Sequence, residues 1–543
     1  MFSKSKDISS RAIIGGGLGI VIVYYALREL RQFKRRNHLK SLRIKKQKER
    51  KEKLESLQCD YSFGPDRAAI VSLTFDQLVQ KLQSRELKAR QVLEAYVAKA
   101  VVATREFNCV TEFIEQAFAT ADELDALPTV KGPLHGIPIC VKDDHHIKGM
   151  DSTLGLSINL YKPKSRDAVV IEVLEEAGAI PFCITNLPQT TFSMAAGGAL
   201  LGTGSDIGGS VRIPAHFCGI ATLKPTSGRI SSRGLNASLE LCAGLEGVSG
   251  MLAAEAKTLA MAYSVLLGGS KQFKKDPATV PMPWNVELFK STQPLRIGYF
   301  TTLAFFPTIG DIPETVLKAK TSLALMGHTL VPFELPDPWH IMEVFASLSF
   351  ADGGNQNYQR LKFDQVSPVA AKFVAGRSFL SYITGVLSSL LGKTSSRDFA
   401  GNPAAQRSEI LWEYLARARA IKYDVIDRMN NLDLDAILCP AFPFAASKVQ
   451  DTDTLLNGIV YTVWGNLIDF PCGVVPFGKE SATKIDDYDD EGDNYLKLAK
   501  QGARLAKDMP IGVQIIAKPY QEEIVVRLLV ELENLKVESS LQE

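Results

Sequence analysis

The sequence predicts an α/β protein with a largely buried sheet. Helix-like segments alternate with short, continuous apolar runs along most of the 543 residues, and 46% of all residues are hydrophobic. Apolar runs of this length next to helical patterns are typical of buried strands in α/β folds. The strand candidates are 136–143, 180–186, 295–300, 436–440, 472–477 and 510–517.

The helical segments carry their own signals. Residues 72–102 show apolar residues at helical spacing, and Thr74 with Gln77 suits a capping box at the start. A second helical pattern, 167–179, leads directly into a strand candidate. Polar stretches such as 478–496 are expected as surface connections. We therefore expect one globular catalytic domain over residues 58–543.

A short N-terminal tail, 1–11, precedes an apolar stretch, 12–27, that contains no charged residue. As a helix this stretch would be about 24 Å long, which suits a thin bilayer. A cleaved signal peptide and a buried helix are the alternatives. No A-x-A-like cleavage site follows, and basic residues flank the stretch on its C-terminal side. We therefore expect a single transmembrane anchor that leaves the catalytic domain in the cytosol, on an endomembrane such as the endoplasmic reticulum.

Residues 28–57 are helix-prone and basic. Thirteen Lys and Arg face three Glu between Arg28 and Lys53, whereas the whole chain has a net charge of only +2. Because the basic character is local, the sequence does not support nucleic-acid binding. The segment is interpreted either as a contact with anionic lipid headgroups or as a solvated spacer.

A second apolar segment, 379–392, is flanked by basic residues but is too short to cross a bilayer. It fits a core helix, and it also fits a helix lying in a membrane surface.

Lys142 ends the strand candidate 136–143, where partial burial would favour its neutral form. A neutral lysine can act as a general base. The alternative is a structural salt bridge to Asp143 or Asp144. The His145-His146 pair suggests a metal, but no further ligand spacing completes a site, so we expect none. The eight cysteines show no paired or zinc-type spacing and are expected to be reduced.

The segment 204–231 contains the turn Asp206-Ile207-Gly208-Gly209-Ser210. Two glycines allow successive backbone N–H groups to point one way, as in a site for an oxyanion. A serine at the end of such a turn can act as a nucleophile, although Gly-Gly-Ser turns are also common without this role. A Ser-His-Asp hydrolase is less suitable, because no G-x-S-x-G motif surrounds Ser210 and His216 is close in sequence.

Several ordered motifs together resemble the amidase signature family, and within it the membrane-anchored fatty-acid amide hydrolases. The resemblance runs from about residue 60 to 535 and rests on "GIPICVKD", "VKDDHHIKGMDSTLGLSINLY", "TNLPQ", "GSDIGGSVRIPAHFCGIATLKPT", "VYTVWGNLIDFPCGVVPF", "PIGVQ" and "PYQEEIVVRLLVELENL".

This resemblance implies a twisted mixed sheet surrounded by helices and a Ser-Ser-Lys mechanism without a cofactor. It implies that Ser210 is the nucleophile, that Lys142 is the base, and that the N–H groups of residues 207–210 (Ile207, Gly208, Gly209 and Ser210) bind the oxyanion. Thr191 falls at a substrate-contacting position of the family, with a different residue type. The resemblance also implies long-chain lipid amides as substrates, a homodimer, and a membrane-dipping cap at 379–392 beside membrane lipids.

The chain departs from the family pattern where Ser193-Met194 leads directly into Ala195-Ala196-Gly197-Gly198, before about Ala199. There the family has a Gly/Ser-rich run that carries the middle serine of the triad, and about thirty residues are missing here. Ser193 and Ser205 do not match that serine. The alternatives are a catalytically impaired or non-catalytic acyl-binding homologue, a truncated isoform, and a general amidase or amidotransferase subunit.

Overall fold

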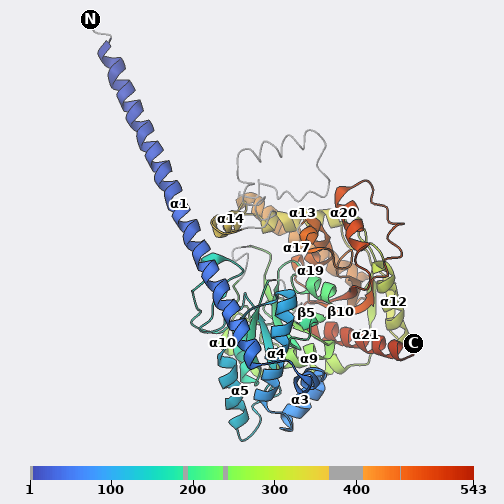
Figure 1. Ribbon diagram of the computed structural model, residues 1–543. Helices are drawn as coiled ribbons and strands as arrows, with labels where there is room; N and C mark the ends of the chain where they lie inside the picture. Colours follow the sequence, from blue (N-terminus) through green and yellow to red (C-terminus); the bar gives the residue numbers. More distant parts are fainter. Residues whose placement is uncertain (1–3, 188–193, 237–241, 366–407, 453, 543) are drawn as a thin grey trace.

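At the centre of the computed structural model lies one mixed sheet of eleven strands, counted over the described residues. Its order is β1-β3-β2-β4-β6-β5-β10-β11-β9-β7-β8. Helices surround the sheet (Figure 1). The strands are β1 (Val110–Phe113), β2 (Pro138–Lys142), β3 (Ile180–Thr185), β4 (Leu201–Asp206), β5 (Ala221–Lys224), β6 (Val248–Ala253), β7 (Arg296–Tyr299), β8 (Thr329–Pro332), β9 (Ala436–Pro440), β10 (Cys472–Lys479) and β11 (Pro510–Ala517).

The structure describes the backbone of residues 4–187, 194–236, 242–365, 408–452 and 454–542, and not the side chains of 4–25, Ser270 and 536–542. The helices are α1 (Lys4–Asp60), α2 (Pro65–Val71), α3 (Phe75–Gln83), α4 (Ala89–Phe107), α5 (Gln116–Ala126), α6 (Val169–Glu176), α8 (Arg212–Cys218), α9 (Ala256–Leu266), α10 (Lys271–Lys275), α11 (Val286–Lys290), α12 (Ile312–Leu325), α13 (Pro338–Ser349), α14 (Asn355–Leu361), α17 (Ser408–Asn431), α18 (Val449–Thr452), α19 (Val460–Leu467), α20 (Asn494–Ala503) and α21 (Glu522–Gln542).

All six strand candidates are strands of this sheet, and the predicted α/β class with a mixed sheet surrounded by helices is confirmed. The capping box is also present, since Thr74 Oγ1 accepts from the N–H of Gln77 and Gln77 Oε1 accepts from the N–H of Thr74. The strands β1, β4, β5, β6 and β8 were not predicted from the sequence. Of these, β4 consists mostly of small and polar residues, which have low strand propensity.

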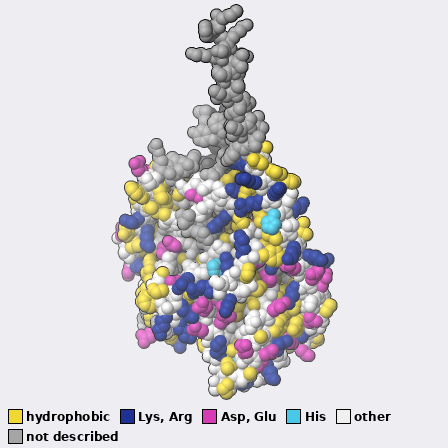
Figure 2. All heavy atoms as spheres, turned by 90° about the vertical axis from the view of Figure 1, so that its left-hand side faces the viewer, with side chains coloured by type: hydrophobic (Ala, Val, Ile, Leu, Met, Phe, Trp, Pro, Cys, Tyr) yellow, Lys and Arg dark blue, Asp and Glu magenta, His cyan; other side chains and the backbone are white. Residues whose placement is uncertain are grey.

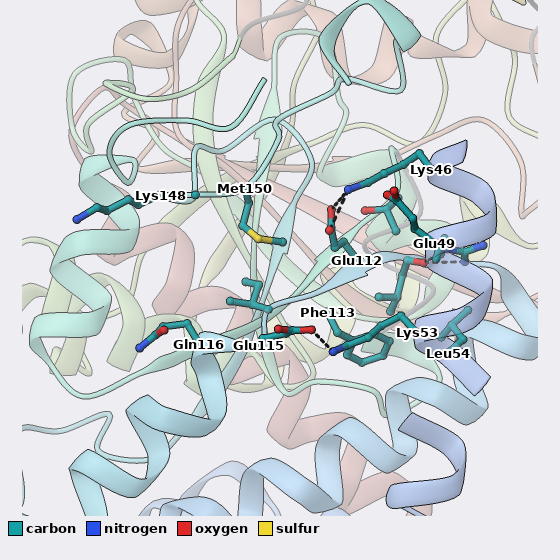
Figure 3. A pocket seen from close by; sticks show the side chains of 15 residues that line it. Lys46, Glu49, Lys53, Leu54, Glu112, Phe113, Glu115, Gln116, Lys148 and Met150 are labelled. Atoms are coloured by element: carbon teal, nitrogen blue, oxygen red, sulfur yellow. Dashed lines mark hydrogen bonds and ion pairs between the residues drawn. The ribbon is translucent and has the colours of Figure 1, made fainter. Parts of the chain in front are cut away.

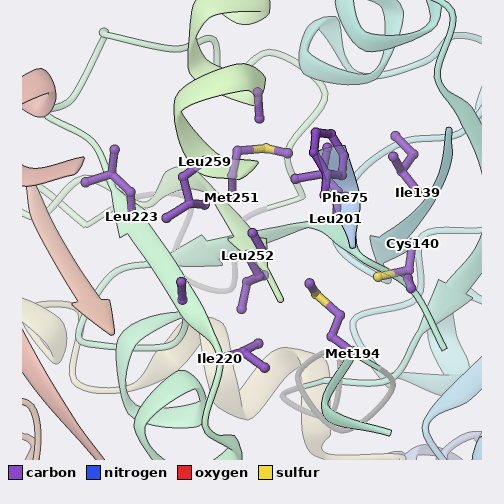
Figure 4. Packing of buried hydrophobic residues seen from close by; sticks show 14 of the residues in the cluster. Phe75, Ile139, Cys140, Met194, Leu201, Ile220, Leu223, Met251, Leu252 and Leu259 are labelled. Atoms are coloured by element: carbon purple, nitrogen blue, oxygen red, sulfur yellow. The ribbon is translucent and has the colours of Figure 1, made fainter. Parts of the chain in front are cut away.

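The sheet separates two hydrophobic clusters, and β9 shows how. Leu438 belongs to one cluster, whereas its neighbours Ile437 and Cys439 belong to the other. Because successive side chains of a strand point to opposite faces, the two clusters lie on opposite faces of the sheet. Helices α4, α9 and α21 contribute to the first cluster, part of which is shown in Figure 4, and α13, α17 and α19 contribute to the second.

Parallel pairing places the ends of two strands together. β2 pairs in parallel with β4, with Ile139 opposite Leu201 and Cys140 opposite Gly202. Parallel strands present their carboxyl ends at the same edge of a sheet. The end of β2 at Lys142 therefore lies at the same edge of the sheet as the end of β4 at Asp206.

Helix α1 extends beyond the body, and only its C-terminal part lies along it (Figure 1). Arg50 donates hydrogen bonds from Nε and Nη2 to the carbonyl oxygen of Val110, at 2.9 and 2.7 Å, and so covers the edge strand β1. Lys46 pairs with Glu112 at 2.9 Å, and Lys53 pairs with Glu115. Figure 2 shows this face of the molecule, where Lys and Arg side chains are interspersed with Asp and Glu side chains.

Over the residues that the structure describes, no helix has both the length and the apolar character that a membrane span requires. The expected anchor, 12–27, falls in α1, where the backbone is helical but the side chains before Ala26 are outside the described part. The transmembrane anchor therefore has no support in the structure and stays a prediction. The expected cap, 379–392, lies outside the described residues.

Candidate active site

Lys142 lies at the end of β2, and its side chain is only 8% exposed. Its Nζ donates a hydrogen bond to Ser205 Oγ on β4 at 2.8 Å and forms an ion pair with Asp144 Oδ2 at 3.0 Å. The hydroxyl of Ser205 in turn donates to Asp144 Oδ2. The salt-bridge alternative for Lys142 is thus observed, with Asp144 as the partner.

Asp143 is buried but faces a different group. Its carboxylate accepts hydrogen bonds from the N–H of Thr153, at 2.7 Å, and from the hydroxyl of Thr153. Burial raises the pKa of Asp143 to about 6, although these hydrogen bonds and others oppose the change. The two adjacent aspartates therefore have separate environments.

Asp144 is fixed from both sides. Burial alone would raise its pKa, but the ammonium of Lys142, the ring of His145 and the hydroxyl of Ser205 hold it well below its usual range. His145 Nδ1 lies 2.8 Å from Asp144 Oδ1, and Nε2 lies 3.2 Å from Ser249 Oγ. An ionised carboxylate only accepts hydrogen bonds, so Nδ1 carries the hydrogen. His145 is thus a partner of Asp144, and the described residues contain no group of three or more His, Cys, Asp or Glu side chains suited to a metal ion.

The turn after β4 is held by a buried ion pair. Arg212 binds Asp206 through two parallel hydrogen bonds, both 3.0 Å long, and both side chains are fully buried. Arg212 Nη1 also donates to the carbonyl of Thr462 on α19 and to Gln514 on β11, each at 2.9 Å. Asn466 Nδ2 donates to Asp206 Oδ1 at 2.8 Å. These contacts fix the turn to elements more than 240 residues away in the chain.

Gly209 has a φ of +122°, a conformation that favours glycine. A Cβ atom at this position would lie 2.3 Å from Thr462 Oγ1, so only glycine fits. Its N–H donates to Asp206 Oδ1 at 2.7 Å and stabilises the turn from within. No described residue accepts a hydrogen bond from the N–H groups of Ile207, Gly208 or Ser210.

Ser210 is exposed at the end of the turn, two residues before α8 begins. Its hydroxyl has no hydrogen bond with Lys142 or with any other described residue. His216 lies in the interior of α8 instead, where Nδ1 accepts from the N–H of Gly512 at 2.9 Å and Nε2 lies 3.0 Å from the carbonyl of Phe444. These partners occupy His216, so it is not a base for Ser210. Thr191 and Ser193 lie outside the described residues.

A cavity of about 500 Å³ between α1 and β1 is separate from this site (Figure 3). It is lined by charged side chains that mostly pair with one another, such as Lys46 with Glu112, and by Phe113 and Met150. None of Lys142, Ser205 and Ser210 lines it.

A family model described as Amidase matches residues 91–194 and 193–526. This chain belongs to the amidase family. The amidase is 32% identical to fatty-acid amide hydrolase 1 of Sus scrofa over 508 residues, which cover 87% of each chain. It is also 32% identical to fatty acid amide hydrolase 1 of Caenorhabditis elegans, covering 86% of this chain and 88% of that one.

The fold of the amidase matches a solved fatty acid amide hydrolase structure with a TM-score of 0.74 at 20% identity, over 89% of this chain and 90% of the other. Together these relationships show that the amidase is a hydrolase acting on amide carbon–nitrogen bonds. They do not favour the alternative of a non-catalytic acyl-binding homologue.

The family match is interrupted at residues 193 and 194. The interruption lies at the start of the stretch 193–199, in which the sequence predicts a departure from the family pattern. Met194, next to the break, is buried against β2 and β4, since its Sδ lies 3.3 Å from a Cβ built on Gly202 (Figure 4). Met194 therefore lies in the core immediately beside the break in the family match.

The residues that hold the site in place were not predicted from the sequence. Asp206 and Arg212 are six residues apart across a Gly-Gly turn, and this spacing of opposite charges was a usable signal. Asn466 and Gln514 are polar residues within the apolar segments 460–467 and 510–517, which also indicates buried hydrogen bonding. Nothing in the sequence indicated the role of His145 except its position next to Asp144.

Proposed function

We propose that the chain cleaves the amide bond of fatty-acid amides through an acyl-enzyme on Ser210, with Lys142 as the base. One observation carries this proposal: Lys142 is joined to Ser205 on β4, and β4 continues within five residues into the exposed Ser210. The substrate class is supported by the names of the two relatives that are 32% identical.

In this mechanism the oxygen of Ser210 attacks the amide carbon, and the serine proton passes to neutral Lys142. The resulting tetrahedral oxyanion collapses, the carbon–nitrogen bond breaks, and Lys142 returns the proton to the departing amine. Water then attacks the acyl ester, releasing the fatty acid and restoring Ser210.

The oxyanion is bound by backbone N–H groups of the turn. Ile207, Gly208 and Ser210 supply these groups, since no described residue accepts a hydrogen bond from them. Gly209 contributes differently, because its N–H binds Asp206 and shapes the turn. Thr191 contacts the substrate.

The substrates are long-chain acyl amides, such as N-acylethanolamines and primary fatty amides, which partition into lipid. An anchor at 12–27, the basic segment 28–57 and a cap at 379–392 would bring the enzyme to membrane lipids of an endomembrane, with the catalytic domain in the cytosol as a homodimer. The reaction needs no cofactor or metal.

The test is labelling with a fluorophosphonate probe, which reacts with an activated serine. We expect labelling of the wild-type chain, loss of labelling in Ser210→Ala, and unchanged labelling in Ser232→Ala, which removes an exposed hydroxyl outside the turn. Folded wild-type protein that is not labelled contradicts the proposal.

The substrate class is tested separately by hydrolysis rates over a series of amides of increasing acyl length. Rates that rise with acyl length support lipid amides. A preference for short or polar amides would instead indicate a general amidase.

A further inference from the structure

Behind Lys142 lies a continuous chain of buried polar side chains. Ser249 Oγ is 3.2 Å from His145 Nε2, His145 Nδ1 is 2.8 Å from Asp144 Oδ1, and Asp144 Oδ2 is 3.0 Å from Lys142 Nζ. Ser205 closes the chain by contacting both Asp144 and Lys142. The side chains of Asp144 and His145 are 3% and 0% exposed, so water does not screen them.

We propose that Asp144, oriented by His145, is a positioning residue that keeps Lys142 in its ammonium form in the resting enzyme and thereby sets the pH at which the enzyme becomes active. This inference rests on the proposed function, because it requires Lys142 to act as the base. It adds Asp144 to that mechanism. It predicts that removing Asp144, the buried ion-pair partner of Lys142, lowers the pH at which the enzyme becomes active.

Two opposing effects act on the ammonium of Lys142. Burial disfavours an ammonium, whereas a carboxylate at 3.0 Å favours it. A general base must first lose its proton, so the carboxylate that stabilises the ammonium opposes catalysis at low pH. Without Asp144, the remaining described partners of Lys142 are the neutral hydroxyl and carbonyl oxygens of Ser205. No carboxylate then opposes the loss of its proton.

The other charged groups around Lys142 are occupied elsewhere. On the segment after β2, Asp143 binds Thr153. On β4, Asp206 binds Arg212 in a fully buried pair. The neighbouring strands β3 and β6 present the neutral groups Thr185 and Ser249. Asp144 is therefore the described carboxylate that pairs with Lys142.

His145 gives Asp144 its orientation. The hydrogen bond from Nδ1 to Oδ1 leaves Oδ2 for Lys142 and Ser205, and the hydroxyl of Ser249 holds the other ring nitrogen. A base held by an oriented carboxylate is a recurring arrangement in hydrolases, although there the carboxylate supports a histidine. Here the carboxylate contacts the lysine itself.

The experiment compares the pH dependence of amide hydrolysis in wild type, Asp144→Asn and Asp143→Asn, with each rate expressed as a fraction of that variant's own plateau. We expect the midpoint of the acid limb to fall by about 1 to 3 pH units in Asp144→Asn. Asp143→Asn is the matched control, since it removes an adjacent buried carboxylate that does not contact Lys142. Its midpoint should stay at the wild-type value.

If Asp144 had only a structural role, Asp144→Asn would lower the plateau rate of hydrolysis without moving the midpoint of the acid limb. An unchanged midpoint in a folded Asp144→Asn variant therefore overturns the inference. His145→Gln provides a second variant if Asp144→Asn does not fold, because it removes the partner that orients Asp144. We expect its midpoint to move in the same direction by a smaller amount.

A second measurement does not depend on activity. Competitive acetylation with acetic anhydride, read by mass spectrometry on the peptide containing Lys142, follows the neutral amine as pH rises. The labelling midpoint should also fall in Asp144→Asn and not in Asp143→Asn. If the labelling midpoint shifts in Asp144→Asn but the wild-type chain hydrolyses no amide, the proposed function is contradicted and the effect of Asp144 on Lys142 is retained. If the labelling midpoint does not shift in Asp144→Asn, the effect of Asp144 on Lys142 is contradicted.

Discussion

Ser205 Oγ lies 2.8 Å from Lys142 Nζ and is the side-chain hydroxyl that contacts this lysine among the described residues. The two residues lie on adjacent parallel strands, at the ends that share one edge of the sheet. The sequence predicts that the segment carrying the middle serine of the family is missing from this chain. The contact places a hydroxyl of β4, five residues before Ser210 in the chain, beside the lysine. We propose that the proton of Ser210 reaches Lys142 through this hydroxyl.

The first prediction concerns this hydroxyl. Ser205→Ala should lower kcat by about 100-fold, within the range found for groups that assist proton transfer. Ser205→Thr keeps the hydroxyl and should retain activity to within a few-fold. Steady-state hydrolysis of a long-chain amide, with thermal melting as the control for folding, measures both. A wild-type rate in Ser205→Ala would show that the proton reaches Lys142 by another route.

The second prediction concerns the ion pair under the nucleophile turn. Arg212→Met leaves Asp206 buried without its bidentate partner, and this should reduce the free energy of unfolding by about 3 to 5 kcal/mol. Arg504→Ala is the control, because it removes an exposed pair with Asp486 and should cost about 1 kcal/mol or less. Denaturation by urea measures both changes, and equal losses in the two variants would contradict the assignment.

The third prediction concerns Gly209. Gly209→Ala combines an unfavourable φ of +122° with a Cβ atom 2.3 Å from Thr462 Oγ1. We expect kcat/KM to fall by at least about tenfold, because the turn must shift around Ser210. Gly492→Ala also has a positive φ, +72°, but no heavy atom lies within 4 Å of its Cβ position. Activity in Gly492→Ala should match wild type, and parallel losses would show that backbone strain alone is responsible.

The fourth prediction concerns pH and Asp143. Burial raises its pKa in the folded chain to about 6, so between about pH 4 and 6 the folded state binds a proton that the unfolded state has released. Its contribution to stability is thus complete below pH 4 and is lost as pH rises through 6, by about 2 to 3 kcal/mol. The free energy of unfolding of wild type relative to Asp143→Asn should fall over this range. If the difference in the free energy of unfolding between wild type and Asp143→Asn stays constant between pH 4 and 7.5, this pKa is contradicted.

Much of the fold was predictable because it depends on local chemistry. A strand such as 510–517 is apolar over nearly its whole length, and the structure places it inside the sheet, between β10 and β9. The capping box at Thr74 depends on two residues three positions apart. By contrast, β4 has the sequence LGTGSD and becomes a strand because β2 and β6 pair with it on both sides. Partners of this kind, distant in the chain, override weak strand propensity.

For the site, the sequence alone determined which residues carry the chemistry: a lysine at the end of an apolar strand, and a serine at the end of a glycine turn. It also indicated an interruption of the family pattern within residues 193–199, where the family match breaks at 193 and 194. Only the tertiary structure decided that Lys142 pairs with Asp144 rather than Asp143, and that Thr462, Asn466 and Gln514 hold the turn. The physical reason is that hydrogen bonds and ion pairs depend on separations of about 3 Å in space, which sequence spacing does not specify.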